Sequence, residues 1–468
     1  MSRAALDSLP IEVFDNVITD LVLDDLRSLR LTARRLAVRI GESHQYASSC
    51  RNVTVSLTTD SDLESFVRMT GPGRPAQHMH HLTLKYTVDL GFSPVDRINT
   101  SFIRECLATS FANLRLHLTY NRLISLSLQV DHVTTRLLYQ RASLVVGRDI
   151  FVDSPPPPWQ WVWHAAAELF TVTFQALYDS NPAVNAIDIF GSVPRCGLSC
   201  GSIETVVDKY MPQSLSSLKC LSISLSDLLP PSHPVESQIF QLMYGRVPPP
   251  SSHQAQIIDA DVSAAGQKAA QVACRFIDRF PDLESLDLHW SCLADRFASG
   301  SHEERHFFQL LAATGVPARL RRLSLKGVFL CEMSLLKFLS KAPHLTHLFM
   351  EHIHLKTGNL QPVFDLLASQ LEYLHLDDLR APREVLFNAP HLLNDPNWRI
   401  VDWRQYTKLT RRGISASRPI SWGVPVECFI ASQEWPCPNH IRLHHGSPVN
   451  QTYPTNEFIP VSDPLRGS

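Results

Sequence analysis

The chain has 468 residues, which is too long for one compact core and predicts two to four domains or one elongated repeat array. Its formal net charge is -2, so no basic excess favours nucleic acid or an anionic membrane surface as a partner. The ten cysteines are scattered singly, the acidic N-terminal segment does not resemble a signal peptide, and no apolar run approaches about 18 residues. We therefore expect a cytoplasmic or nuclear protein that does not span a membrane.

Residues 1–45 are predicted to form three short helices. Pro10 suits the first turn of a helix, where its missing N–H costs nothing, and Glu12 complements the helix dipole there. The apolar face of this first helix is Phe14, Val17, Ile18 and Leu21. In the third helix we expect an inward face of Ala33, Leu36, Ala37 and Ile40, and an outward face of Arg34, Arg35 and Arg39. This spacing alone leaves two interpretations open, a helical cap on a larger fold or a docking module.

The same segment carries short motifs in a characteristic order: Leu9-Pro10-x-Glu12, Ile18, Leu21, Asp25-Leu26, Leu29-Arg30-Leu31 and Arg34-Arg35-Leu36. This order resembles the F-box, although the family often has a bulky residue or a cysteine where Ala33 stands. The resemblance implies binding to the small Skp-family linker subunit, and through it to a cullin. Carried over to this sequence, the residues at the linker interface or in the packing of the helices are Leu9, Pro10, Ile18, Leu26 and Leu29.

From about residue 80 a second pattern recurs, L-x-x-L-x-L, which is typical of the strand in a leucine-rich repeat. The clearest copies begin at Leu283, Leu320, Leu345 and Leu371, and weaker copies begin at Met79, Leu123, Val184 and Leu218. The last three clear copies lie 25 and 26 residues apart, with short amphipathic segments between them. Strand and helix in alternation at this spacing predict a solenoid over residues 46–395, with a parallel sheet on its concave face.

The predicted fold is therefore α/β: an N-terminal three-helix F-box followed by an irregular leucine-rich-repeat solenoid. It resembles the fungal F-box proteins with degenerate repeats. The remaining alternative is an ordinary α/β domain with leucine-rich strands. We expect exposed Pro-rich insertions near 153–159 and 229–256, and a C-terminal cap with a disordered tail over 396–468.

One irregularity concerns the turn after each strand. The regular repeat has an asparagine or cysteine there, which bonds the backbone inside the turn. In this chain the corresponding positions are Ser291, Val328, Ile353 and Leu379. Because this polar ladder is largely missing, we predict looser turns and uneven curvature.

Residues between the leucines are expected to face the concave surface, since side chains alternate along a strand. They form three rows: Ser285, Arg322, His347 and Tyr373; Asp287, Ser324, Phe349 and His375; His289, Lys326, Glu351 and Asp377. The rows mix both charges with aromatic rings, which favours a protein ligand over nucleic acid. The residues assigned to target binding are Arg322, Lys326, His347, Phe349, Glu351, Tyr373, His375 and Asp377.

The sequence carries none of the common catalytic or nucleotide-binding motifs: no phosphate loop, dinucleotide fingerprint, nucleophile elbow or HExxH helix. Cys196 and Cys200 are too far apart for a CxxC pair. A zinc site is a minor alternative for the spacing C-x8-C-x2-H-x3-H, formed by Cys428, Cys437, His440 and His444. We expect no catalytic residue, no resident metal and no cofactor.

Three functions are compatible with these patterns. The leading one is a non-enzymatic substrate adaptor of an SCF-type cullin-RING ubiquitin ligase, which binds a Skp-family linker through the F-box and an unidentified protein target through the repeats. The second is a binding scaffold of the same fold outside any ligase. The third is an enzyme with an unfamiliar site.

Overall fold

A computed structural model describes most of the chain. The described residues are 6, 9–21, 23–72, 78–88, 99–118, 122–132, 159–193, 196–226, 267–268, 270–291, 302–367, 370–381, 383–387, 407–420, 422–425 and 441–444. The expected Pro-rich insertions lie outside these residues, except for Trp159 at the end of the first, and so does most of the expected C-terminal tail. No helix in the described ranges is both long and apolar enough to cross a bilayer.

The chain begins with four short helices, α1 (Ile11–Ile18), α2 (Leu23–Thr32), α3 (Arg34–Glu42) and α4 (His44–Ser49), which we call the N-terminal module. Ser43 starts α4 because its hydroxyl accepts a hydrogen bond from the backbone N–H of Tyr46. The module buries a small core of its own: Phe14, Ile18, Leu26, Ile40, Tyr46 and Cys50. The helical segment therefore continues past the expected boundary at residue 45.

Three side chains of the module point differently from the expectation. Val17 is 54% exposed, because Phe14 and Ile18 alone take the inward face of α1. Ala33 is the exposed N-cap of α3, where the backbone is extended and its side chain leaves the helix face. Arg39 turns inward, where its guanidinium lies 5.0 Å from the centre of the Phe14 ring and donates a hydrogen bond to the carbonyl of Leu9.

The rest of the described chain is built on one large, mostly parallel sheet in a mixed α/β arrangement. Its strands lie side by side in chain order: β1 (Asn52–Ser56), β2 (His81–Val88), β3 (Leu123–His132), β4 (Val184–Ile189), β6 (Cys220–Ser226), β7 (Ser285–Ser291), β8 (Arg322–Lys326), β10 (His347–Glu351), β12 (Tyr373–Asp377) and β16 (Lys408–Arg412). The short β5 (Leu198–Ser199) pairs with β6, and only β16 runs antiparallel to its neighbour.

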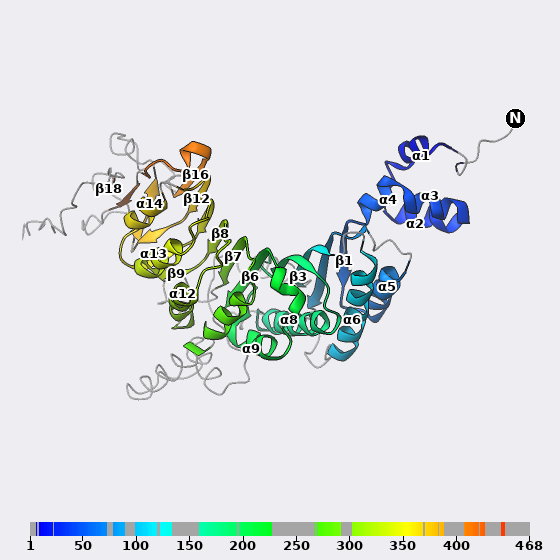
Figure 1. Ribbon diagram of the computed structural model, residues 1–468, viewed down its shortest axis with the longest axis horizontal. Helices are drawn as coiled ribbons and strands as arrows, with labels where there is room; N and C mark the ends of the chain where they lie inside the picture. The colour runs from blue at the N-terminus through cyan, green and yellow to red at the C-terminus, as the bar shows by residue number, and fades with distance from the viewer. Residues whose placement is uncertain are drawn as a thin grey trace, which may run out of the picture.

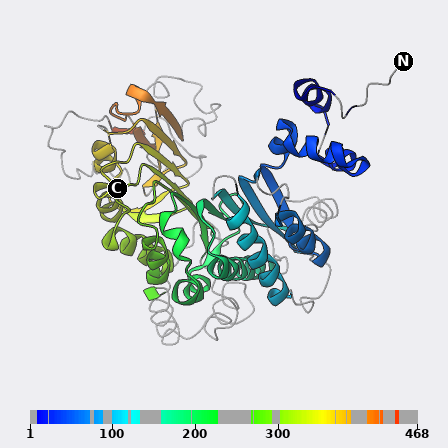
Figure 2. The same cartoon turned by 45° about the vertical axis from the view of Figure 1, so that its right-hand side comes forward.

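Helices connect successive strands and lie on one side of the sheet (Figure 1). They are α5 (Asp60–Thr70), α6 (Thr100–His117), α8 (Trp159–Ser180), α9 (Cys200–Lys209), the 3-10 helix η3 (Gln213–Ser217), α12 (His302–Thr314), α13 (Glu332–Ser340) and α14 (Gln361–Leu367). Figure 1 and Figure 2 show the sheet curving, with the helices on its outer side and the N-terminal module beyond the β1 end. None of the helices named above lies on the inner face of the sheet.

The apolar side chains of the leucine pattern pack between the sheet and the helices. In all eight predicted copies the three apolar residues are buried, and their strands all belong to the large sheet. They join the helices in one continuous core, in which the rings of Phe170, Phe174, Phe276 and Phe280 pack edge to face and tilted against one another. Three strands of the large sheet were not predicted: β1 at the first edge, β16 at the last edge and the two-residue β5.

A second sheet, in the order β14 (Arg383–Glu384), β13 (Arg380–Ala381), β11 (His354–Thr357) and β9 (Phe329–Cys331), forms at the turns after β8, β10 and β12. Val328, Ile353 and Leu379 are buried there, and backbone groups bond directly from one turn to the next. The N–H of His354 donates to the carbonyl of Val328 at 3.0 Å, and the N–H of Arg380 donates to that of Ile353 at 2.8 Å. The prediction of loose turns is wrong here, because backbone pairing replaces the missing side-chain ladder.

The end of the sheet is closed by the C-terminal region. β16 pairs with β12, η7 (Gly413–Ser415) follows it, and β15 (Leu386–Phe387), β17 (Trp422–Pro425) and β18 (Ile441–His444) make a small antiparallel sheet. Trp422 is buried against the ring of Phe364, and its indole N–H donates to the side-chain oxygen of Gln361 at 2.8 Å. This part of the chain thus covers apolar residues of the last helix.

Candidate protein-binding surface

The strand register confirms the three predicted rows on the open face of the sheet. Arg322 pairs with His347 and His347 with Tyr373, and the other two rows follow in the same register. The antiparallel β16 extends each row by one residue, so Arg412 continues the first row, Thr410 the second and Lys408 the third. The sequence had not indicated these three residues, because β16 carries no leucine repeat.

Two arginines and two aromatic rings stack across the last four strands, and we call this set the arginine–aromatic ladder. The guanidinium of Arg322 lies 4.5 Å from the ring centre of Phe349, that ring lies 4.7 Å from the ring of Tyr373, and the guanidinium of Arg412 lies 5.4 Å from Tyr373. The imidazole of His347 stacks on Tyr373 at 5.9 Å with an interplanar angle of 10°. Such stacking holds each arginine in place while its edge remains exposed.

Charges in the third row neutralise one another. Lys326 contacts Glu351 at 2.8 Å, and Lys408 contacts Asp377 at 3.6 Å. Burial opposes ionisation of Glu351, but the hydrogen bond and charge of Lys326 outweigh it, so the pKa of Glu351 lies below its ordinary value. An exposed pair of this kind contributes only about 0–1 kcal/mol to stability. The row therefore presents little net charge to a partner.

The middle of the open face is lined by small polar side chains. Asp188 accepts hydrogen bonds from Ser127 at 3.1 Å and from the N–H of Gly191 at 2.9 Å. Burial raises the pKa of Asp287, against the opposing effect of a hydrogen bond from Ser324. Burial also lowers the pKa of His289 to about 4, so this imidazole is neutral near pH 7. This region lacks the protruding rings of the ladder.

The residues assigned to target binding differ in how far they are accessible. Arg322 and Lys326 are exposed, and five others are half-buried: His347, Phe349, Glu351, Tyr373 and Asp377. His375 is buried, because it lies between Phe349, Glu351 and the hydroxyl of Thr410, which is 2.8 Å from its Nδ1. His375 thus supports the neighbouring side chains and offers almost no contact area itself.

The residues assigned to linker binding are distributed between the core and the surface of the N-terminal module. Ile18 and Leu26 are fully buried and pack the helices, Leu9 and Leu29 are half-buried, and Pro10 is exposed. Several apolar side chains that the sequence analysis did not assign to linker binding are exposed instead: Ile11, Val13, Val17, Leu31 and Val38. Exposed apolar residues on so small a unit are typical of a docking surface.

The described residues hold no group of side chains arranged for metal binding. No three histidine, cysteine, aspartate or glutamate side chains among them come together in a metal-binding group. Of the four residues of the zinc alternative, His444 is the last residue of β18, and the other three lie outside the described ranges: Cys428, Cys437 and His440. Cys196 and Cys200 are buried, and burial raises the pKa of Cys196 to about 12, which disfavours the reactive thiolate.

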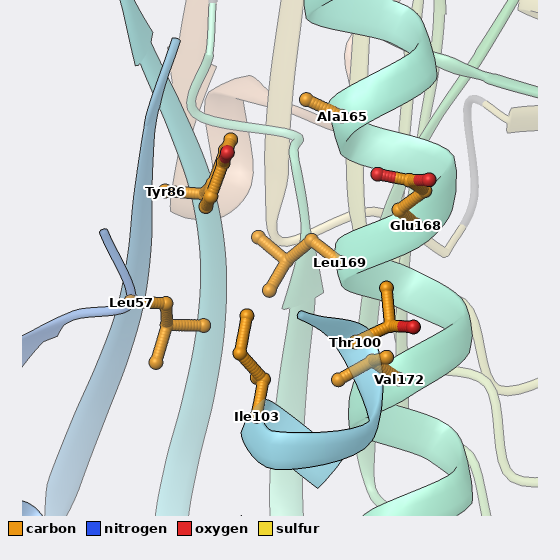
Figure 3. A pocket seen from close by; sticks show the side chains of 8 residues that line it. All are labelled: Leu57, Tyr86, Thr100, Ile103, Ala165, Glu168, Leu169 and Val172. Atoms are coloured by element: carbon orange, nitrogen blue, oxygen red, sulfur yellow. The ribbon is translucent and has the colours of Figure 1, made fainter. Parts of the chain in front are cut away.

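One small hollow lies between the sheet and α6 and α8 (Figure 3). It is lined mostly by apolar side chains, among them Leu57, Ile103, Leu169 and Val172, together with Tyr86 and Glu168. Its volume of about 10 Å³ has room for about one water molecule. A packing defect of this size is not a substrate site.

Comparison with protein-family models and with curated proteins finds no match to this chain. The residues of the N-terminal module and of the open face therefore carry the functional interpretation by themselves.

Proposed function

We propose that this protein is the substrate adaptor of an SCF-type cullin-RING ubiquitin ligase, with the N-terminal module as an F-box and the remaining chain as an irregular leucine-rich-repeat solenoid. The F-box would bind a Skp-family linker and the open face of the sheet a protein target. The ligase partners would supply the chemistry, so the chain itself acts as a non-catalytic adaptor.

The observation that carries this proposal is the separation of the module from the rest of the protein. Its apolar core is one cluster and the core of the large sheet is another. A helical unit of about 40 residues buries little apolar surface and usually depends on a partner. Here it leaves Val13 and Val17 exposed on one side of α1, next to the exposed Pro10 at the start of that helix. The rest of the chain supplies a second, independent surface for a target.

Co-purification with a Skp-family linker tests the proposal. The full chain is expected to retain the linker, and Val13→Asp/Val17→Asp is expected to lose it, because two charges would enter an apolar interface without disturbing the core of the module. The matched control is Leu116→Asp/Met333→Asp, which places the same charges on exposed apolar positions of α6 and α13.

Failure of the wild-type chain to bind the linker would refute the adaptor role and leave the scaffold outside a ligase. Equal binding by all three proteins would refute only the interface on α1. Pro10→Ala then tests the remaining exposed residue of the F-box motif.

A further inference from the structure

We propose that the arginine–aromatic ladder binds an extended acidic peptide segment, whose two anionic side chains contact Arg322 and Arg412 while an apolar side chain between them lies on Phe349 and Tyr373. This inference names the class of target for the open face and so rests on the proposed function. The shared chemistry is a pair of anionic groups, either carboxylates or phosphates.

The first support is an unbalanced charge. Both arginines are exposed, and neither makes an ion pair within the described part of the chain. The carboxylate of Glu284 pairs with Lys219 at 2.8 Å, and no ion pair joins Asp287 to Arg322 among the described residues. The first row therefore carries two unmatched positive charges beside a third row that is already neutral.

The second support is the fixed orientation of the guanidinium groups. Each lies over an aromatic ring, at 4.5 Å for Arg322 and 5.4 Å for Arg412. A guanidinium held in this way loses less freedom when its N–H groups donate to a carboxylate or phosphate, and its planar fork suits both anions. The rings that position the arginines also offer an apolar surface between them.

The third support is spacing. Arg322 and Arg412 belong to β8 and β16, which are three strand spacings apart in the same row. At about 4.8 Å per strand the separation is about 14 Å, which an extended peptide covers with about four residues. A segment with two acidic residues about four positions apart and an apolar residue between them matches this length.

Selection from a random heptapeptide library displayed on phage, with the full-length chain as bait, tests the proposal. We expect the selected peptides to be enriched in pairs of Asp or Glu three to five positions apart around an apolar residue. Arg322→Glu/Arg412→Glu is expected to abolish this enrichment. The matched control Lys209→Glu/Lys337→Glu makes the same change in charge on exposed positions of α9 and α13, and is expected to retain it.

Synthetic versions of one selected peptide then show whether the arginines bind carboxylate or phosphate groups. Replacing both acidic residues by Gln is expected to weaken binding at least tenfold by fluorescence anisotropy, and 0.5 M salt is expected to weaken it similarly, since exposed charges are screened. A phosphoserine version that binds at least tenfold more tightly than the Glu version identifies a phosphorylated ligand. Equal or weaker binding identifies a carboxylate ligand.

Selection without acidic enrichment, or with the same enrichment on the charge-reversed variant, would overturn the proposal. If charge reversal lowers the unfolding temperature, Arg322→Gln/Arg412→Gln replaces it. Linker co-purification by the charge-reversed variant should equal that of the wild type. A wild-type chain that retains the linker but selects no acidic peptides contradicts this inference alone and leaves the adaptor role standing.

Discussion

His289 lies in the middle of the open face, where its Nδ1 is 3.3 Å from the hydroxyl of Ser224. Burial, assisted by the positive charge of Lys326, lowers its pKa from 6.5 to about 4. An imidazole with this pKa stays neutral between about pH 6.5 and pH 4, a range in which an ordinary histidine gains a proton. The folded protein therefore binds a proton at this site less readily than the unfolded chain.

The stability of the protein should decrease as the pH falls from about 6.5 to about 4, because only the unfolded state gains a proton on His289 over that range. The loss is up to about 3 kcal/mol at about 1.4 kcal/mol per pKa unit. His289→Gln is expected to remove this part of the pH dependence, measured by urea unfolding at pH 7 and pH 4.5. The control His344→Gln, at an exposed position, should leave the slope intact; an unchanged slope in His289→Gln would contradict the assignment.

At the scale of elements, the turns after β8, β10 and β12 are held together by backbone hydrogen bonds, in place of the polar side chains found in a regular leucine-rich repeat. Gly327, His352 and Asp378 occupy equivalent places in three successive turns, all with positive φ, at 71°, 55° and 47°. The backbone N–H of each donates to a carbonyl at the end of the neighbouring strand or just before it. Gly327 donates to Glu351 at 2.9 Å, His352 to Asp377 at 2.9 Å and Asp378 to Thr407 at 3.2 Å. The three turns thus share one backbone geometry although their residues differ.

Gly327→Ala is expected to reduce the free energy of unfolding by about 2–4 kcal/mol, because a Cβ at this φ is strained and would lie 2.5 Å from the carbonyl oxygen of Trp290. Gly413→Ala separates the strain of a positive φ from the close contact with Trp290. Gly413 also has positive φ, at 56°, but a Cβ there would meet no atom within 4 Å. We expect about 1 kcal/mol there. Equal losses in chemical denaturation of the two variants would mean that the close approach to Trp290 is unimportant.

The strands of the sheet were predictable where a leucine repeat marks them and hidden where it does not. The apolar triplets from Leu283 to Leu376 indicate strand, face and register together, because a period of two places every intervening residue on the open side. β1, β5 and β16 were not predicted because they have no such triplet. Arg412 was missed for the same reason, since it belongs to β16. The burial of His375 and the stacking of Phe349 on Tyr373 depend on side-chain rotamers, which spacing does not specify.

At the scale of the whole molecule, the strands follow one another in chain order, and the N-terminal module adds a separate core at the β1 end. Each strand of the large sheet therefore pairs mainly with strands that are close to it in chain order. Sequence spacing predicted this division into a small helical unit and a long repetitive part. It did not predict the fourth helix of the module, because α4 has too few residues for a visible period.

Removing residues 1–49 should leave the large sheet folded, because the two apolar cores are separate. The full chain is expected to show an additional calorimetric transition from the module, which the shortened chain lacks. The main transition should move by no more than about 3 °C, the shift that about 1 kcal/mol produces in a large domain. Loss of the main transition on truncation would show that the two cores fold as one cooperative unit.

β16 closes the last edge of the sheet and also carries Arg412, so folding of this strand and recognition are linked equilibria. A molecule in which β16 has detached exposes the unpaired edge of β12 and presents only one arginine of the ladder. The apparent affinity for a ligand that needs both arginines is scaled by the fraction of molecules with β16 in place. Such a ligand stabilises β16 in return, so occupancy of the face and protection of the sheet edge rise together.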